Sequence, residues 1–214
     1  MNFELKLKVC GLTKLDQIEE LISLNTDFLG FIFYEKSPRY VLNFLTLDEI
    51  KSINHQAKVG VFVNESLERI VEISTKAALN YIQLHGDEDN DFIFNLREKL
   101  NHEIKMIKVF RIGTELENLK FKIQNLESEV DYFLFDTDSK SFGGTGHSFN
   151  WQILNDLEIT KPYFLSGGIS DENIDHIKLL NQQPFALDIN SKFEIEPGNK
   201  DVQKIKKFKN LLSY

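Results

Sequence analysis

The sequence predicts a single (β/α)8 TIM barrel with a parallel eight-stranded core. Short apolar runs alternate with longer amphipathic stretches along the whole chain, which is typical of βα units on a parallel sheet. The alternation gives eight such units within 214 residues, with no linker or low-complexity tract between them. The first turn, at residues 10–13, lacks the G-x-G-x-x-G pattern that often marks an open doubly wound sheet. We therefore expect one domain spanning residues 1–214.

Each predicted strand is followed by a helix that would cover the outside of the barrel. The predicted strands are Leu5–Cys10, Phe28–Phe33, Lys58–Val63, Tyr81–Leu84, Lys105–Arg111, Tyr132–Asp136, Tyr163–Ser166 and Phe185–Ile189. The helices that follow them, in the same order, are Leu15–Leu24, Leu47–Asn54, Leu67–Ala78, Asp89–Leu100, Glu115–Leu126, Asn150–Leu157, Asp171–Leu180 and Asp201–Leu212. Active sites of such barrels lie at the carboxyl ends of the strands, so chemically active residues there are candidates for function.

Composition excludes several kinds of protein. A formal net charge of −8 gives no basic footprint for nucleic acid. A single cysteine cannot form an intramolecular disulfide, which favours a reducing cytoplasm. No apolar run approaches the ~18 residues that cross a bilayer, so no membrane association is expected. One cysteine and five scattered histidines give no zinc spacing, and we expect no metal.

Two strand ends carry groups suited to proton transfer. Cys10 ends the first strand, where a thiolate would face the barrel mouth as a base or nucleophile. The alternative for a lone cysteine is a small buried hydrophobic residue. Asp136 ends the very apolar sixth strand, so desolvation should raise its pKa and suit it to general acid catalysis. The alternative for Asp136 is a cap on the loop that follows.

Glycine-rich segments follow the sixth and seventh strands. Residues 142–147 read Phe-Gly-Gly-Thr-Gly-His, which is typical of a mobile lid or of a long surface turn. Gly167 and Gly168 allow backbone N–H groups to approach an anion beside a helix N-terminus. Phosphate sites in these barrels often follow strands seven and eight. The pattern predicts a phosphate cradle, with a plain tight turn as the alternative. Strand eight adds three polar residues to the same face: Asp188, Asn190 and Ser191.

Arg39 and His85 lie after the second and fourth strands. Arg39 stands in a Ser-Pro-Arg-Tyr loop, and a guanidinium pairs with a carboxylate through two hydrogen bonds. The alternative is a surface arginine. His85 could polarise a substrate or could be a hydrogen-bonded structural histidine.

Together these motifs resemble the phosphoribosylanthranilate isomerase family of tryptophan biosynthesis. The matching segments, which cover nearly the whole chain, are KVCGLT (8–13), GFIFYEKSPRY (30–40), VGVFVNE (59–65), IQLHGDE (82–88), LFDTDSKSFGGTGHSFNW (134–151), FLSGGIS (164–170) and ALDINSKFEIEPGNKD (186–201). The resemblance implies an Amadori rearrangement of N-(5-phosphoribosyl)anthranilate to 1-(2-carboxyphenylamino)-1-deoxyribulose 5-phosphate, without a metal or an organic cofactor.

The resemblance also implies roles for individual residues. Asp136 would be the general acid that protonates the furanose ring oxygen, and Cys10 the general base that removes the C2 proton. Arg39 would meet the anthranilate carboxylate, and Gly167 and Gly168 with the strand-eight loop would bind phosphate. The expected substrate-binding set is Arg39, His85, Gly167, Gly168, Asp188, Asn190 and Ser191. The expected partner is a phosphorylated sugar substrate, bound by a monomer or a homodimer.

The strand-eight loop departs from the family pattern. The family usually has Ser-Ser-Gly after the aspartate, where this chain has Asn190, Ser191 and Lys192. We expect a loop conformation that lysine tolerates, rather than a strained copy of the glycine backbone. His147 also replaces a common lysine.

Two other functions compete with this one. The aldose isomerase of histidine biosynthesis has a similar reaction type, but it uses an aspartate at the first strand, where this chain has Cys10. The second alternative is a non-catalytic phosphosugar-binding barrel.

Overall fold

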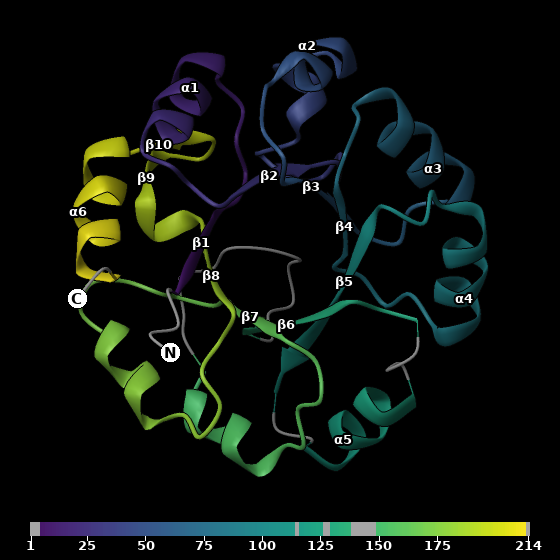
Figure 1. Cartoon of the computed structure of the whole chain (residues 1–214), viewed down its shortest axis with the longest axis vertical. Coiled ribbons are helices and arrows are strands. Elements are labelled where there is room, and N and C mark those ends of the chain that lie inside the picture. The colour runs from purple at the N-terminus through teal and green to yellow at the C-terminus, as the bar shows by residue number, and fades with distance from the viewer. Residues whose placement is uncertain (1–4, 114–115, 126–128, 138–148, 213–214) are drawn as a thin grey trace.

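Eight parallel strands close into a barrel in strict chain order, and β8 pairs with β1 (Figure 1). The computed structural model describes residues 5–113, 116–125, 129–137 and 149–212. The barrel strands are β1 Lys6–Val9, β2 Phe28–Ile32, β3 Lys58–Phe62, β4 Tyr81–Leu84, β5 Lys105–Ile112, β6 Tyr132–Thr137, β7 Tyr163–Leu165 and β8 Ala186–Ile189. The predicted fold class is confirmed, and both ends of each predicted strand lie within one residue of the observed ends.

A ring of helices surrounds the strands (Figure 1). The α-helices are α1 Leu15–Ser23, α2 Leu47–Ser52, α3 Leu67–Lys76, α4 Asn90–Lys99, α5 Leu116–Asn125 and α6 Val202–Leu212. The 3-10 segments are η1 Val41–Asn43, η2 Trp151–Asp156, η3 Ile174–Leu179 and η4 Ser191–Phe193. Side chains define several helix starts: Thr46 and Glu49 form a reciprocal capping box on α2, and Ser66 and Asp89 cap α3 and α4.

Two predicted helices are wrong in type. The segments predicted as Asn150–Leu157 and Asp171–Leu180 form only the short 3-10 helices η2 and η3. After β7, the Asn173 side chain accepts a hydrogen bond from the Ser170 N–H and donates one to the Gly168 carbonyl, each at 2.9 Å. Such side-chain bonds compete with helical backbone bonds. No α-helix therefore begins at Asp171, and the dipole argument for a phosphate site does not apply there.

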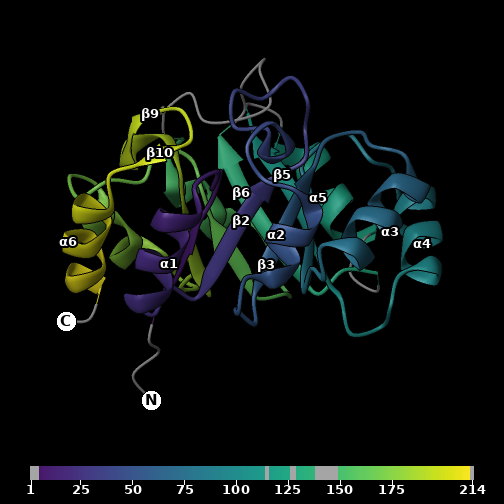
Figure 2. The ribbon, with the colours of Figure 1, turned by 90° about the horizontal axis from the view of Figure 1, so that it is seen from above.

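The connection from β8 to α6 contains a small hairpin that the sequence analysis did not predict. Strands β9 Glu194–Glu196 and β10 Asn199–Lys200 pair antiparallel around a Pro-Gly turn. Gly198 adopts φ +82°, a conformation that glycine reaches without steric cost. The Thr13 hydroxyl donates a 2.6 Å hydrogen bond to the Gly198 carbonyl, which holds the hairpin against the loop after β1. Figure 2 shows the hairpin at the edge toward which the β2 and β6 arrows point.

Aromatic rings fill the amino-terminal half of the barrel interior. The rings of Phe28, Tyr81, Tyr132, Phe164 and Phe185 pack against one another, with centroids 5.1 to 6.1 Å apart. Because strand residues two apart share a face, the inward positions nearer the carboxyl ends include Lys8, Gln83 and Asp188, all buried. The aromatic cluster therefore occupies one end of the barrel interior. The polar inward residues lie at the other end, where the active site is expected.

Candidate active site

Cys10 is buried directly after β1, beside Gly30 of β2, which has no side chain. The residue is 5% exposed, and a Cβ atom added to Gly30 would lie 3.0 Å from the Cys10 sulfur. Burial raises the pKa of the Cys10 thiol above its ordinary value, although the positive charge of Lys8 acts in the opposite direction. Cys10 thus needs a nearby cation to ionise, and the barrel provides one.

Lys8 and Asp188 form an ion pair inside the barrel. The β1–β8 register sets the two residues opposite each other, and the Lys8 Nζ lies 2.9 Å from the Asp188 Oδ1. Lys8 is fully buried, yet the charge and the hydrogen bond of Asp188, together with Cys10, outweigh desolvation and raise the lysine pKa. Burial raises the pKa of Asp188. The expected substrate-binding residue Asp188 therefore has a lysine, which sequence reasoning missed, as its direct partner.

Asp136 and His85 face each other from β6 and the end of β4. The His85 Nε2 lies 3.4 Å from the Asp136 Oδ2, and the His85 Nδ1 lies 3.0 Å from the Gln83 side-chain nitrogen. The second Asp136 oxygen accepts a 2.8 Å hydrogen bond from the Thr137 N–H. His85 thus has the hydrogen-bonded partner of the structural alternative and also lies beside Asp136, and its action on a substrate stays a prediction.

The Glu194 carboxylate lies between Arg39 and Lys200 and connects the loop after β2 with the segment after β8. The Arg39 Nε lies 3.0 Å from both oxygens of Glu194, and its Nη2 lies 2.6 Å from the Oε2. The Lys200 Nζ lies 2.6 Å from the other Glu194 oxygen and 2.8 Å from the Asn190 side-chain oxygen. Arg39 is only 9% exposed, so the surface-arginine alternative is wrong. Two cations and one anion leave excess positive charge, which suits an anionic ligand.

Glycines bring these groups close to one another. A Cβ atom on Gly11 would lie 2.7 Å from the Arg39 Cδ and 2.9 Å from the Asn190 Oδ1. A Cβ atom on Gly167 would lie 3.1 Å from Asp136 and would collide with Thr137. Gly167 and Gly168 adopt φ +86° and +66°. Because neither has a side chain, this turn places only backbone atoms beside Asp136. Ser191 begins η4 directly after Asn190.

The predicted residues thus gather at one end of the barrel, whereas several of their partners were missed. Lys8, Gln83, Glu194 and Lys200 were not singled out as candidates. For Lys8 and Gln83 a signal exists, because each stands two residues before a predicted site residue on the same strand. The predicted lid at 142–147, with His147, lies outside the described residues.

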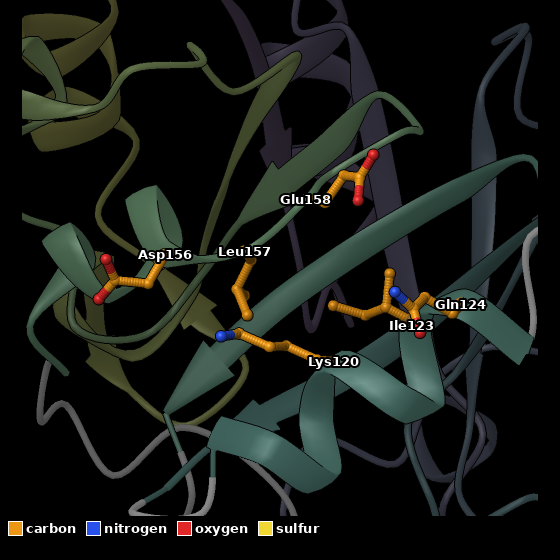
Figure 3. A pocket seen from close by; sticks show the side chains of 6 residues that line it. All are labelled: Lys120, Ile123, Gln124, Asp156, Leu157 and Glu158. Carbon is orange, nitrogen blue, oxygen red and sulfur yellow. The ribbon is translucent and has the colours of Figure 1, made fainter.

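A groove of about 220 Å³ lies elsewhere, between α5 and the end of η2 (Figure 3). None of the residues that line it is among the candidates at the strand ends. The lining residues are Lys120, Ile123, Gln124, Asp156, Leu157 and Glu158. Within the described ranges, no three histidine, cysteine or acidic side chains gather as a metal site requires. None of the helices described combines the length and apolar character that a bilayer crossing requires.

Comparison with known proteins identifies the family. A family model described as N-(5'-phosphoribosyl)anthranilate isomerase matches residues 7–210. The chain belongs to this family. The N-(5'-phosphoribosyl)anthranilate isomerase of Parabacteroides distasonis is 40% identical, over 94% of this chain and 90% of its own. That of Petrotoga mobilis is 39% identical over 94% of both chains.

Solved structures of N-(5'-phosphoribosyl)anthranilate isomerases agree with the barrel. The enzyme of Thermotoga maritima superposes with a TM-score of 0.81 at 29% identity, over 98% of both chains. Another structure, at a TM-score of 0.77 and 27% identity over 98% of both chains, holds the isomerase in complex with reduced 1-(o-carboxyphenylamino)-1-deoxyribulose 5-phosphate. Membership in the family makes this chain an enzyme, an isomerase of tryptophan biosynthesis.

Proposed function

We propose that this chain converts N-(5'-phosphoribosyl)anthranilate to 1-(2-carboxyphenylamino)-1-deoxyribulose 5-phosphate, with Asp136 as general acid and Cys10 as general base. The observation that carries the assignment is their placement at the same end of the barrel, on β6 and directly after β1, with different neighbours. Cys10 lies among buried lysines, whereas Asp136 lies against His85 and the glycine turn. An acid and a base that act on one sugar need different environments, since they must start in opposite protonation states.

Asp136 opens the sugar ring in the first step. Its carboxyl group donates a proton to the furanose oxygen, the C1–O bond breaks, and the nitrogen lone pair forms the C1=N bond of a Schiff base. The His85 Nε2, at 3.4 Å from the Asp136 Oδ2, can donate to the carboxylate that this step leaves behind. A hydrogen bond to the charged form lowers the cost of releasing the proton.

Cys10 acts in the second step. Its thiolate takes the C2 proton, the C2–H electron pair forms the C1=C2 bond, and the C1=N pair returns to nitrogen. The resulting enolamine tautomerises to the ketone product. No redox change occurs, and the isomerisation has no net proton uptake: ring opening consumes the proton that Asp136 supplies, and C2 gives one to Cys10. Before the next turnover, Cys10 releases a proton and Asp136 takes one up.

Charged and bare-backbone groups hold the two anionic ends of the substrate. Arg39 pairs with the anthranilate carboxylate, because its guanidinium has donors beyond the Nε and Nη2 that Glu194 occupies. The phosphate binds at the loops after β7 and β8, where Gly167 and Gly168 expose backbone and Asn190 and Ser191 follow β8.

A turnover assay with freshly made phosphoribosylanthranilate tests the function. The wild-type chain should consume the substrate, and Cys10→Ala and Asp136→Asn should each lower kcat by ~10²–10⁴-fold with smaller changes in KM. A non-catalytic binder would bind a product analogue and show no turnover. Near-normal kcat in either variant would contradict the role given to that residue.

The same proposal includes the cellular location, the domain extent and the oligomeric state of the enzyme. We place it in the cytoplasm, as one catalytic domain over residues 1–214, with the sugar phosphate as its partner and without nucleic acid, membrane or cofactor. Its single cysteine is free and buried, which suits a reducing compartment. One related enzyme of known structure is described as dimeric, and for this chain we propose a monomer or a homodimer, which size-exclusion chromatography with light scattering would decide.

A further inference from the structure

Lys8 has no task in the reaction as written above, although it lies next to the proposed base. It is fully buried and stands two residues before Cys10, so both side chains lie on the same side of β1. Its Nζ lies 2.9 Å from the Asp188 Oδ1, and its charge also interacts with Cys10. A buried ammonium is costly without a partner, and Asp188 is the partner of Lys8.

The charged groups around Cys10 come from three strands. Lys8 lies on β1, Asp188 on β8 and Lys200 on β10, and each influences the ionisation of the thiol. Asp188 makes a thiolate less favourable and Lys200 makes it more favourable, but the ammonium of Lys200 is paired with Glu194 at 2.6 Å. Lys8 has the largest opposing effect on the rise that burial causes in the pKa of Cys10.

We propose that Lys8 is a positioning residue for the isomerisation: its ammonium, anchored by Asp188, holds the Cys10 sulfur and stabilises the thiolate that removes the C2 proton. This inference rests on the proposed role of Cys10. When the proton moves from C2 to sulfur, the thiolate becomes a neutral thiol and Lys8 keeps its proton, so no charge leaves the interior. Asp188 then acts through Lys8, by keeping that lysine charged and fixed, rather than by touching the substrate.

The chain allows a clean measurement of this effect, because Cys10 is its single cysteine. Thiolate absorbance near 240 nm and the pH dependence of alkylation by iodoacetamide therefore report on Cys10 alone. The test variants are Lys8→Met and the double variant Lys8→Met with Asp188→Asn. The double variant leaves no unpaired buried charge, so it keeps the test available if the single variant fails to fold.

Lys58→Met is the matched control. Lys58 is also a buried strand lysine, at 4% exposure, but its Nζ donates to the carbonyls of Ile50 and Lys51. The loss of that lysine removes a buried strand ammonium and its hydrogen bonds to backbone carbonyls, and those hydrogen bonds do not involve Cys10.

We expect the thiolate titration of Lys8→Met to move to higher pH, together with the limb of the kcat profile that rises as the thiol ionises. The double variant should move less, because Asp188→Asn also removes a charge that disfavours the thiolate. At neutral pH, kcat should fall about tenfold or more, since each unit of rise in the thiol pKa lowers the thiolate fraction tenfold. KM should change little, and Lys58→Met should match the wild type in titration and pH profile.

An unchanged titration and an unchanged pH profile in folded Lys8→Met, or in the double variant when it is compared with Asp188→Asn alone, would overturn the proposal, even if kcat fell. Turnover by Cys10→Ala is a separate outcome: it would refute Cys10 as the base and end the catalytic part of this inference. The titration would still show whether Lys8 stabilises the thiolate, so the two failures are distinguishable.

Discussion

The guanidinium of Arg39 and the carboxylate of Glu194 meet in a bidentate pair, with the Nη2 at 2.6 Å from the Oε2, although 155 residues separate them in the sequence. The Glu194 side chain is 3% exposed and also receives Lys200. This pair connects the loop after β2 with the hairpin after β8. The hairpin therefore helps to hold the residue proposed to bind anthranilate, and Glu194 should contribute to the stability of the fold.

Glu194→Gln should destabilise the fold by about 3–5 kcal/mol, because it leaves two buried cations without their anion. Urea unfolding followed by circular dichroism measures the change. Glu196→Gln is the control, because Glu196 is exposed on the same hairpin and should shift the free energy of unfolding by no more than about 0.5 kcal/mol. Equal midpoints for the two variants would show that the Glu194 cluster contributes nothing to stability.

The stabilising effect of Glu194 should depend on pH. Burial acts to raise its pKa, but Arg39 and Lys200 outweigh burial and hold the pKa below its ordinary value of 4.5. A carboxyl group with a lowered folded-state pKa stabilises the protein fully above its unfolded pKa and loses that effect as pH falls through the folded pKa. The gap in unfolding free energy between wild type and Glu194→Gln should therefore be constant near neutrality and shrink below about pH 4.5. A gap that widened on acidification would contradict the assignment.

Arg39→Ala should weaken binding of the anthranilate-bearing substrate. Loss of a hydrogen bond between charged groups costs about 1.5–3 kcal/mol, or roughly 10–150-fold in KM. The proposed acid and base stay in place, so kcat should change less. Steady-state kinetics measure both constants, and Arg97→Ala is a control, since that arginine lies at the end of α4 and contacts Asp131 and the carbonyls of Asn101 and Ile104. Unchanged KM and kcat in Arg39→Ala would remove Arg39 from the site.

Much of this architecture follows from local sequence, and the rest depends on contacts that local sequence does not encode. The alternation of apolar and amphipathic runs predicts eight strands, and the rule of strand ends then selects Cys10, His85 and Asp136. The partner of Lys8 lies 180 residues away, and only the β1–β8 register brings the two together. The helix expected at Asp171 fails because the Asn173 side chain takes backbone hydrogen bonds. The hairpin β9–β10 was missed because its strands are only three and two residues long.

Lys192 occupies the position where the family usually has glycine, and its backbone is not strained. It lies within the 3-10 segment Ser191–Phe193. The non-glycine residues with positive φ in the described part of the chain are Asn25, Asn64 and Ala78, so Lys192 is not among them. Its side chain is exposed, and its carbonyl accepts a 2.9 Å hydrogen bond from the Lys204 ammonium. The expectation of a loop that lysine tolerates is confirmed.

Lys192→Gly should therefore bring no gain in stability. Glycine gives the unfolded chain more freedom, so the variant should lose up to about 1 kcal/mol rather than gain it. Thermal unfolding without ligand measures the effect, and Lys192→Ala separates loss of the side chain from added backbone freedom. The alanine variant should unfold close to the wild type and the glycine variant at or below it. A glycine variant that melted clearly above both would mean that lysine strains this loop, since relief of a left-handed conformation would return ~1–2 kcal/mol.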